Sequence, residues 1–282
     1  MQALATAAAC YVASASPGAG PLQVITRSRV ERVPDLLFYA PYVAGQVFQI
    51  TDAPTGAPVW QHHDGADTYN CPEFHTRYQP CVGRLLLELA SPTCASPIPV
   101  SGVLVHHADM WVNPHRLLAS FNASVPWLPA RGIGAAPTVC ASGAELAADT
   151  TAPWHENSKA LGLAALEKIQ AGGERLRPRA WPAGRLCFGH GDIFYLPASM
   201  IGRWGGWAQA FEGVMHECAV PTLVHAAAAE LGAVPLDTAC EGHCCAFLGN
   251  PDLRASNCAH RIDFELPELR AQLRDVLSGG PM

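Results

Sequence analysis

Two histidines and an aspartate at the end of an apolar segment could together bind a cation. Residues 100–105 are mostly aliphatic and β-branched, a pattern typical of a strand that is buried on both faces. His106, His107 and Asp109 follow, and ligands of open α/β sheets bind just outside the carboxyl ends of strands. Because alternate residues of an extended chain point the same way, His107 and Asp109 share a face and could bind one ion. The alternative is a strand end whose polar residues only meet water or cap the next helix.

Three more groups of polar residues come at the ends of apolar segments. Residues 189–192, Gly-His-Gly-Asp, separate two short apolar stretches, which predicts a hairpin or a close approach of the backbone. His216 and Glu217 end a predicted helix, although such a carboxylate can also serve only to bind free backbone N–H groups. Residues 258–261, Cys-Ala-His-Arg, form the third group.

The periodicity of the apolar residues predicts the elements that position these groups. Residues 102–105 have too few polar side chains to face water, so we predict an interior strand of a mainly parallel sheet with helices on both faces. Prolines and glycines interrupt residues 52–80, which we predict to be a polar loop or, alternatively, a second metal cluster. Further predicted strands are residues 22–26, 35–39, 47–51, 186–188 and 193–196, and predicted helices are residues 81–90, 156–170, 204–215, 222–231 and 266–277.

Length and charge limit the classes of protein that fit. The chain has 282 residues, a formal net charge of −6 and no long basic run, so nucleic acid is not an expected partner. We predict a single α/β domain over residues 21–282, after an Ala-rich and poorly ordered lead over residues 1–20. The lead lacks the basic start of a signal peptide. No stretch reaches the roughly 18 apolar residues that a membrane span needs.

The cysteines indicate an oxidising compartment. Eleven cysteines are many for a reduced cytosolic protein, and they favour disulfides whose pairing the sequence leaves open. The sequon that begins at Asn122 is compatible with glycosylation there. We therefore expect the secretory pathway, in the Golgi lumen or outside the cell. Cys240 and His243 with Cys258 and His260 allow the alternative of a structural zinc site, although disulfides would use the same sulfurs.

Two further patterns have both a binding and a structural interpretation. Arginines are concentrated over residues 175–185, either as a solvated linker or as a clamp for a diphosphate. Trp204 and Trp207, separated by two glycines, could stack on the apolar face of a sugar or belong to the core.

The order of the polar groups resembles that of GT-A-type glycosyltransferases, which use nucleotide-diphosphosugar donors. The metal motif of that family is D-x-D at a strand end, and His107 and Asp109 stand in its place. The family's glycine loop, which borders donor and acceptor, would correspond to residues 189–192. The acid of its x-E-D motif, at the start of a helix, would match Glu217, and its C-terminal metal-binding histidine would match His260 or, less well, His243.

The resemblance, which extends over about residues 22–264, implies a Rossmann-like sheet and sugar transfer to a glycan or protein acceptor. Mn²⁺ or Mg²⁺ would bridge the donor phosphates, and the imidazole favours Mn²⁺. Glu217 would be the base that takes the acceptor proton, and Asp192 would hydrogen-bond an acceptor hydroxyl. The residues that would bind donor or acceptor are Gly189, Gly191, Trp111, Trp204 and Trp207.

Two departures from the family's pattern leave a second interpretation open. His107 replaces the first aspartate of D-x-D, and the acidic pair of x-E-D is reduced to Glu217. A catalytically inactive domain that binds a glycan or a partner protein is therefore the alternative.

Overall fold

We describe the fold from a computed structural model of the chain. It describes residues 11–13, 21–27, 47–53, 59–63, 66–72, 74–89, 98–113, 115–116, 122–129, 138–148, 155–173, 177–182, 184–240 and 252–277. The predicted strand over residues 35–39 and the zinc candidate His243 lie outside these ranges.

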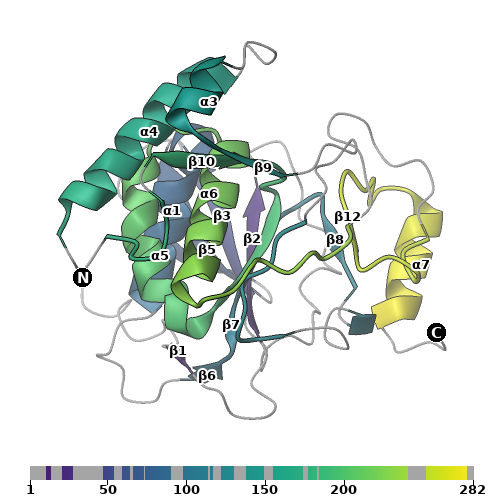
Figure 1. Ribbon diagram of the computed structural model, residues 1–282. Helices are drawn as coiled ribbons and strands as arrows, with labels where there is room; N and C mark the ends of the chain where they lie inside the picture. Colours follow the sequence, from purple (N-terminus) through teal and green to yellow (C-terminus); the bar gives the residue numbers. More distant parts are fainter. Residues whose placement is uncertain are drawn as a thin grey trace, which may run out of the picture.

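A six-stranded mixed sheet forms the centre of the fold (Figure 1). Its central strands are parallel, in the order β5 (Ala66–Pro72), β3 (Val47–Ala53), β2 (Pro21–Arg27) and β7 (Gly102–His107). Antiparallel strands close both edges, β4 (Val59–His63) beside β5 and β11 (Ile193–Pro197) beside β7. The predicted α/β class is therefore confirmed, although the sheet is mixed rather than mainly parallel.

Strand β7 is interior, as its apolar sequence predicts. It lies between β2 and β11, and its side chains at Val103, Leu104 and Val105 are at most 1% exposed. Val103 and Val105 belong to one hydrophobic cluster and Leu104 to another, because alternate side chains point to opposite faces of the sheet. Burial of each such side chain stabilises the fold by about 1.5–3 kcal/mol.

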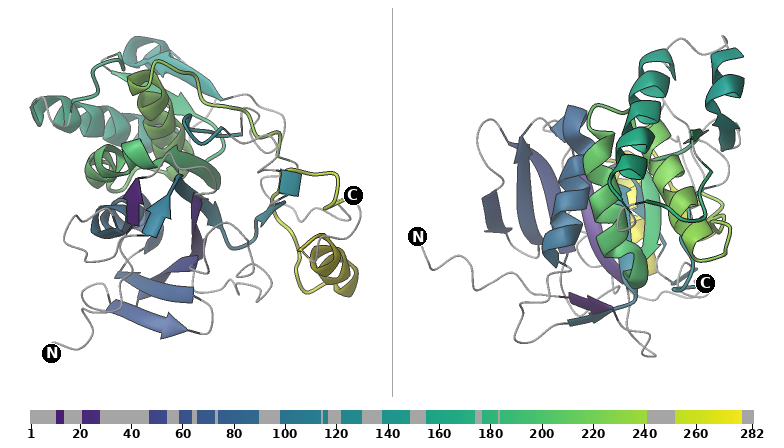
Figure 2. Two further views of the ribbon diagram at one scale, coloured as in Figure 1. Left: turned by 90° about the horizontal axis from the view of Figure 1, so that it is seen from below. Right: turned by 60° about the vertical axis from the view of Figure 1, so that its left-hand side comes forward.

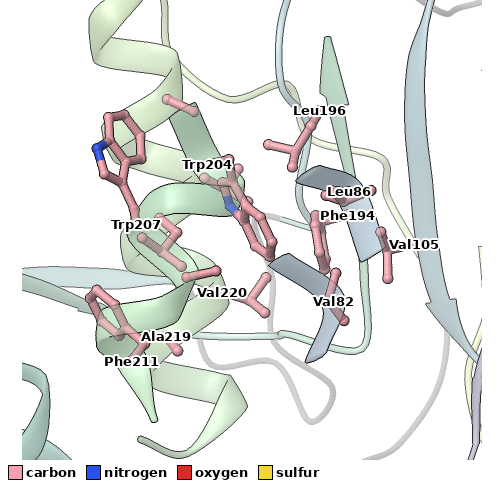
Figure 3. Close-up of a cluster of buried hydrophobic side chains, with 14 of the residues drawn as sticks. Val82, Leu86, Val105, Phe194, Leu196, Trp204, Trp207, Phe211, Ala219 and Val220 are labelled. Atoms are coloured by element: carbon pink, nitrogen blue, oxygen red, sulfur yellow. The ribbon is translucent and has the colours of Figure 1, made fainter. Parts of the chain in front are cut away.

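One face of the sheet is covered by α1 (Phe74–Leu89), α5 (Ile201–Ala208) and α6 (His216–Glu230), with α4 (His155–Ala171) packed against α6 (Figures 1 and 2). Their apolar side chains join those of β7 and β11 in one cluster. Figure 3 shows Phe194 of β11 beside Trp204 of α5 and Val82 of α1. The ring centroids of Phe194 and Trp204 are 5.3 Å apart, within the range of favourable aromatic pairs.

The C-terminal segment covers the other face. Helix α7 (Pro267–Leu277) contributes Leu269 to a cluster with Ile25 of β2, and Figure 2 shows this helix across the sheet from α1. Strand β12 (Cys258–Ala259) pairs antiparallel with β8 (Trp111–Val112), which follows β7 in the chain. This pairing brings the residues after β12 to the carboxyl end of β7.

The remaining elements are short. They are β1 (Tyr11–Ala13) paired in parallel with β6 (Ile98–Val100), β9 (Val139–Ser142) paired antiparallel with β10 (Arg185–Phe188), helix α3 (Gly143–Ala148), and the 3₁₀ turns η2 (Ala198–Met200) and η3 (Gln209–Phe211). Within the described ranges, no helix combines the length and apolar character that crossing a membrane requires.

The prediction of a loop over residues 52–80 is wrong, because β4, β5 and the start of α1 occupy most of it. His63 of β4 is paired with Ala66 of β5, so only two residues join these strands. They are Asp64 and Gly65, a pair strongly favoured in tight hairpin turns. That signal outweighs the helix- and strand-breaking residues around it.

Helix α6 begins at His216, whereas the sequence predicts the end of a helix there. Pro221 lies inside α6 and has no N–H to donate to the carbonyl oxygen of Glu217, four residues earlier. The carbonyl oxygen of Glu217 instead accepts a hydrogen bond from the backbone N–H of Gly189, at 2.9 Å. The first turn of α6 is therefore tied to the glycine-rich loop between β10 and β11.

Candidate metal centre

Asp192 lies among four histidines. Its Oδ1 atom is 2.9 Å from His216 Nε2 and 3.3 Å from His107 Nδ1. Its Oδ2 atom is 3.2 Å from His190 Nε2 and 3.4 Å from His260 Nε2. The four rings come from the end of β7, the loop before β11, the start of α6 and the segment after β12. Residues far apart in the sequence therefore surround a single carboxylate.

Backbone contacts hold these elements together. The backbone N–H of His107 donates a hydrogen bond to the carbonyl oxygen of Asp192, at 2.9 Å. A Cβ atom at Gly191 would lie 2.7 Å from the carbonyl oxygen of His216, closer than real Cβ contacts allow. Because residue 191 is glycine, α6 approaches closely enough for His216 to hydrogen-bond Asp192. The close backbone approach expected for residues 189–192 is present.

Asp109 supplies a second carboxylate beside His260. Its Oδ2 atom is 3.5 Å from His260 Nε2 and 3.5 Å from Arg261 Nε. The backbone N–H of Ile262 donates to the carbonyl oxygen of Asp109, at 3.1 Å. One ligand atom each from His107, Asp109 and His260 lie within 4.8 Å of one another. The predicted convergence of these three residues is confirmed, while their binding of a cation stays a prediction.

Glu217 lies on the solvent side of the cluster. Its Oε1 atom is 3.2 Å from His216 Nε2. The side chains of Glu217, His216 and His107 are 32%, 27% and 20% exposed, whereas those of His190 and His260 are only 3% and 5% exposed. A ligand from solvent can therefore reach the centre from the side of Glu217 and His216.

His106 supports the centre and does not join it. Its Nδ1 atom is 2.7 Å from the carbonyl oxygen of His107, to which it must donate. Its Nε2 atom therefore accepts a hydrogen bond from the side-chain amide of Gln23, at 2.8 Å. Burial lowers the pKa of His106 to about 4, so the ring is neutral and both nitrogens are used.

Burial and the mutual contacts of the cluster set its protonation. Burial would raise the pKa of Asp192, but His107 and the other histidines outweigh it and hold this pKa well below its usual value. Burial likewise acts against the ionised form of Asp109, but its hydrogen-bonding contact with His260, with smaller effects of His107 and Arg261, lowers its pKa. Burial lowers the pKa of His107 to about 4. The carboxylates are therefore ionised and His107 is neutral, which are the forms that bind a metal ion.

Asp192 and Glu217 favour the protonated form of His216. Burial disfavours its charged form, but the hydrogen bond to Asp192 and the charges of Asp192 and Glu217 raise its pKa. A cation that binds to His216 must compete with a proton, so binding strengthens as pH rises.

The residues fit a divalent metal ion. In the described part of the chain, the buried polar atoms without a hydrogen-bond partner include several atoms of the centre: Asp109 Oδ1, Glu217 Oε2, His260 Nδ1 and His190 Nδ1. Such atoms are rare in folded proteins unless water or an ion binds them. Imidazoles combined with carboxylates suit divalent transition metals better than Mg²⁺. The donor set could therefore hold a divalent transition metal.

The tryptophans that were expected to bind donor or acceptor are buried. Trp111, Trp204 and Trp207 are at most 1% exposed. The indole N–H of Trp111 donates to the carbonyl oxygen of Leu253, at 3.1 Å, and Trp204 and Trp207 pack in the core shown in Figure 3. No ring face is open for a sugar to stack on. The core interpretation of Trp204 and Trp207 replaces the binding one, and Trp111 is corrected in the same way.

Gly189 and Asp192 of the glycine-rich loop have different roles: the first allows close packing, and the second is a candidate metal ligand. A Cβ atom at Gly189 would lie 2.3 Å from Thr138 Oγ1, so Gly189, like Gly191, makes room for a neighbouring segment. Asp192 was expected to hydrogen-bond an acceptor hydroxyl. Both of its oxygens face imidazoles within 3.5 Å, which makes it a candidate metal ligand.

Sequence reasoning missed His190 and His216 as members of the centre. One signal was available, because His190 and Asp192 repeat the His-x-Asp spacing of His107 and Asp109. The pattern places a second imidazole and carboxylate beside the strand that pairs with β7. The sequence marks His216 only as a polar residue at the end of a predicted helix, and its ring reaches the centre because α6 begins there.

Two disulfides lie within the described residues, as the cysteine content predicts. Cys140 and Cys187 join β9 to β10, with Cα atoms 4.0 Å apart. Cys240 and Cys258 have Cα atoms 4.6 Å apart, and Cys258 comes two residues before His260. The second disulfide uses both sulfurs of the alternative zinc site, which removes that alternative for the oxidised protein.

Two other predicted features lie away from the centre. Asn122 is exposed, as glycosylation there requires.

Arg185 lies over the ring of Trp181, 5.8 Å from the ring centroid. The ring of Trp181 is in turn 6.2 Å from the ring of His225. His225 comes nine residues after His216 in α6, about 13 Å along the helix. Arg185 therefore does not reach the metal centre as a diphosphate clamp would.

Neither models of known protein families nor the curated proteins give a match to this chain. We therefore infer function from the chemistry and position of the centre.

Proposed function

We propose that this chain is a divalent-cation-dependent glycosyltransferase with a GT-A-like variant of the Rossmann-like fold. It would transfer a sugar from a nucleotide-diphosphosugar to a glycan or protein acceptor, with Mn²⁺, or less favourably Mg²⁺, as the cofactor.

The observation that carries the proposal is the place where the histidines and aspartates meet. In chain order, the parallel strands are β2, β3, β5 and β7, and β7 lies on the opposite side of β2 from β3 and β5. The order of the strands therefore reverses between β2 and β7. In open α/β sheets, nucleotide ligands bind outside the carboxyl ends of the strands at this reversal. His107 and Asp109 lie there, and Asp192 is adjacent.

Four residues would hold the cation against the donor. His107, Asp109 and His260 converge, and Asp192 lies within 3.4 Å of two of these three side chains. When bound, the cation supplies positive charge that stabilises the diphosphate as it leaves the sugar. Without a cation, the carboxylates of Asp109 and Asp192 would repel the donor phosphates.

Glu217 would be the general base. It lies beside His216 and keeps access to solvent, so that it can meet both the centre and an arriving acceptor. In an inverting transfer, Glu217 would take the acceptor hydroxyl proton as that oxygen forms a bond to the anomeric carbon and the bond to the diphosphate breaks. His216, which lies between Asp192 and Glu217, places this base beside the centre.

The cellular setting that we propose is the secretory pathway, in the Golgi lumen or outside the cell. The two described disulfides and the exposed Asn122 of the sequon are the features that support it. Disulfides form and persist in oxidising compartments.

The test is a screen of nucleotide-diphosphosugars for binding and for sugar transfer, with Mn²⁺, with Mg²⁺ and with EDTA. We expect one donor class to bind in the presence of Mn²⁺ and to be turned over when glycan or peptide acceptors are added. Binding without any turnover would support the inactive, glycan- or partner-binding alternative. If no donor binds in the presence of either metal, the proposal is overturned.

A further inference from the structure

We propose that the centre holds two cations, which share the carboxylate of Asp192 as a bridge. One position is formed by Asp192 Oδ1 with His107 and His216, and the other by Asp192 Oδ2 with His190 and His260. This inference rests on the cation-binding part of the proposed function and not on sugar transfer.

The pairing of the rings with the two carboxylate oxygens carries the inference. His107 and His216 lie 3.3 Å and 2.9 Å from Oδ1, and ligand atoms of the three residues lie within 4.8 Å of one another. His190 and His260 lie 3.2 Å and 3.4 Å from Oδ2, and these three residues form a second such group. Each oxygen thus has two imidazoles of its own. A carboxylate in this arrangement can bind one ion with each oxygen.

The second position also has another carboxylate at hand. Asp109 Oδ2 lies 3.5 Å from His260 Nε2. The second position would therefore have two imidazoles and two carboxylates, counting Asp192, and the first would have two imidazoles and the carboxylate of Asp192. Such mixed nitrogen and oxygen ligands suit divalent transition metals.

A single ion leaves part of the cluster unexplained. Bond lengths of about 2.0–2.2 Å limit the ligands of one ion to a sphere around it, and the group His107, Asp109 and His260 would serve one ion. His190 has no place in that group. It is 4% exposed, its Nε2 atom lies 3.2 Å from Asp192 Oδ2, and its Nδ1 atom lacks a hydrogen-bond partner within the described residues. A second ion would account for this buried imidazole, which is aimed at a carboxylate.

The charges of the cluster also agree with two ions. Asp109, Asp192 and Glu217 carry three negative charges, and Arg261 lies beside Asp109 at the rim. Two divalent ions would leave a small positive excess on the exposed side of the centre. That excess is complementary to the phosphates of a nucleotide-diphosphosugar.

The experiment counts metal in the full-length, disulfide-intact protein. The chain is freed of metal with EDTA, loaded with Mn²⁺ alone and desalted, and bound manganese is measured by mass spectrometry. Electron paramagnetic resonance then distinguishes isolated Mn²⁺ from a pair of ions in magnetic exchange. We expect two Mn²⁺ per chain and the exchange-coupled spectrum.

Three variants assign the ions to positions. His190→Gln and His216→Gln remove ligands of different positions, so each should reduce the count to one and convert the spectrum to that of isolated Mn²⁺. His225→Gln changes a histidine elsewhere in α6 and should still bind two. Because His190 is buried, circular dichroism is used to check that the His190→Gln variant is folded. The His216→Gln variant changes a partly exposed side chain and so tests the inference even if His190→Gln does not fold.

The outcomes separate this inference from the proposed function. One Mn²⁺ per chain at saturation, with an unchanged count in His190→Gln, would overturn the two-ion centre and leave a single-ion transferase standing. Two coupled ions without any sugar transfer would support the centre and count against the transferase. No bound Mn²⁺ would overturn the inference together with the cation-binding part of the proposed function.

Discussion

The carbonyl oxygen of Glu217 accepts its hydrogen bond from Gly189, in another element, at 2.9 Å. Within a regular helix this oxygen would bind the N–H of residue 221, but residue 221 is proline. A proline inside α6 therefore frees an acceptor that anchors the glycine-rich loop. The loop contributes His190 and Asp192 to the centre, and the helix contributes His216. This one backbone hydrogen bond therefore connects two of the segments that build the centre.

Gly191→Ala tests the close approach on which the centre depends. The new methyl group would lie 2.7 Å from the carbonyl oxygen of His216, so α6 must move away from Asp192. We expect a loss of about 1–3 kcal/mol in the free energy of unfolding and weaker binding of Mn²⁺, measured by urea unfolding and by titration calorimetry.

Gly202→Ala is the matched control for that substitution. Gly202 lies in α5, and a Cβ atom there would have no atom within 4 Å. Because alanine favours helix over glycine, the control should be stabilised by up to about 1 kcal/mol with unchanged metal affinity. Equal effects of the two substitutions would contradict the steric role of Gly191.

The pH dependence of stability should report His106. Burial lowers its pKa from 6.5 to about 4, so between these pH values the unfolded chain binds a proton that the folded chain does not. Stability from this group is complete above about pH 6.5 and falls as pH decreases toward 4, by about 3 kcal/mol in all. In metal-free protein, His106→Gln should be less stable at pH 7 and lose less stability over this interval. Urea unfolding at a series of pH values measures both, and parallel curves for the two proteins would refute the assignment.

The sequence predicted the strand and part of the centre. The apolar residues 100–105 define an interior strand because neither face tolerates water, and His107 and Asp109 follow at its end. That His260 would join them, some 150 residues later, came from the order of motifs and not from any local pattern. Its convergence with His107 and Asp109 is confirmed, while the GT-A-like identity and the transfer reaction remain proposals.

The rest of the centre depends on contacts that a linear pattern does not contain. The ring of His216 reaches Asp192 because Gly191 leaves room and Pro221 frees an acceptor, and both effects require the folded backbone. For the buried tryptophans the sequence suggested a binding role that the fold does not allow. The spacing of Trp204 and Trp207 is equally compatible with a surface on which a sugar stacks and with a place in the core. Burial decides between these roles, and burial is a property of the whole fold.

The disulfide between Cys240 and Cys258 should support metal binding. Cys258 lies in β12, two residues before His260, and β12 pairs with β8 beside the end of β7. The double substitution Cys240→Ser with Cys258→Ser should lower the free energy of unfolding by about 3 kcal/mol, as expected for a closed loop of this length. It should also weaken Mn²⁺ binding, because the segment with His260 is less restrained.

The other disulfide gives the control for this effect. Cys140 and Cys187 join β9 and β10, and Cys140→Ser with Cys187→Ser should lower stability with a smaller change in metal affinity. Thermal unfolding and calorimetric titration with Mn²⁺ measure the two quantities. If both double variants bind Mn²⁺ as the parent does, the disulfide beside His260 has only a general stabilising role.

Substitution of the two carboxylates should separate catalysis from donor binding. Glu217→Gln keeps the shape of the side chain but removes the proposed base, whose contribution to rate is typically about 10²–10⁴. Turnover should therefore fall by that order, with little change in affinity for the nucleotide-sugar.

Asp109→Asn removes a negative charge beside His260, so it should weaken metal-dependent donor binding as well as turnover. Glu167→Gln, on the exposed surface of α4, should change neither. Donor affinity by calorimetry with Mn²⁺ and initial rates of transfer measure the two effects, and parental turnover in Glu217→Gln would mean that Glu217 is only a residue of the first helical turn.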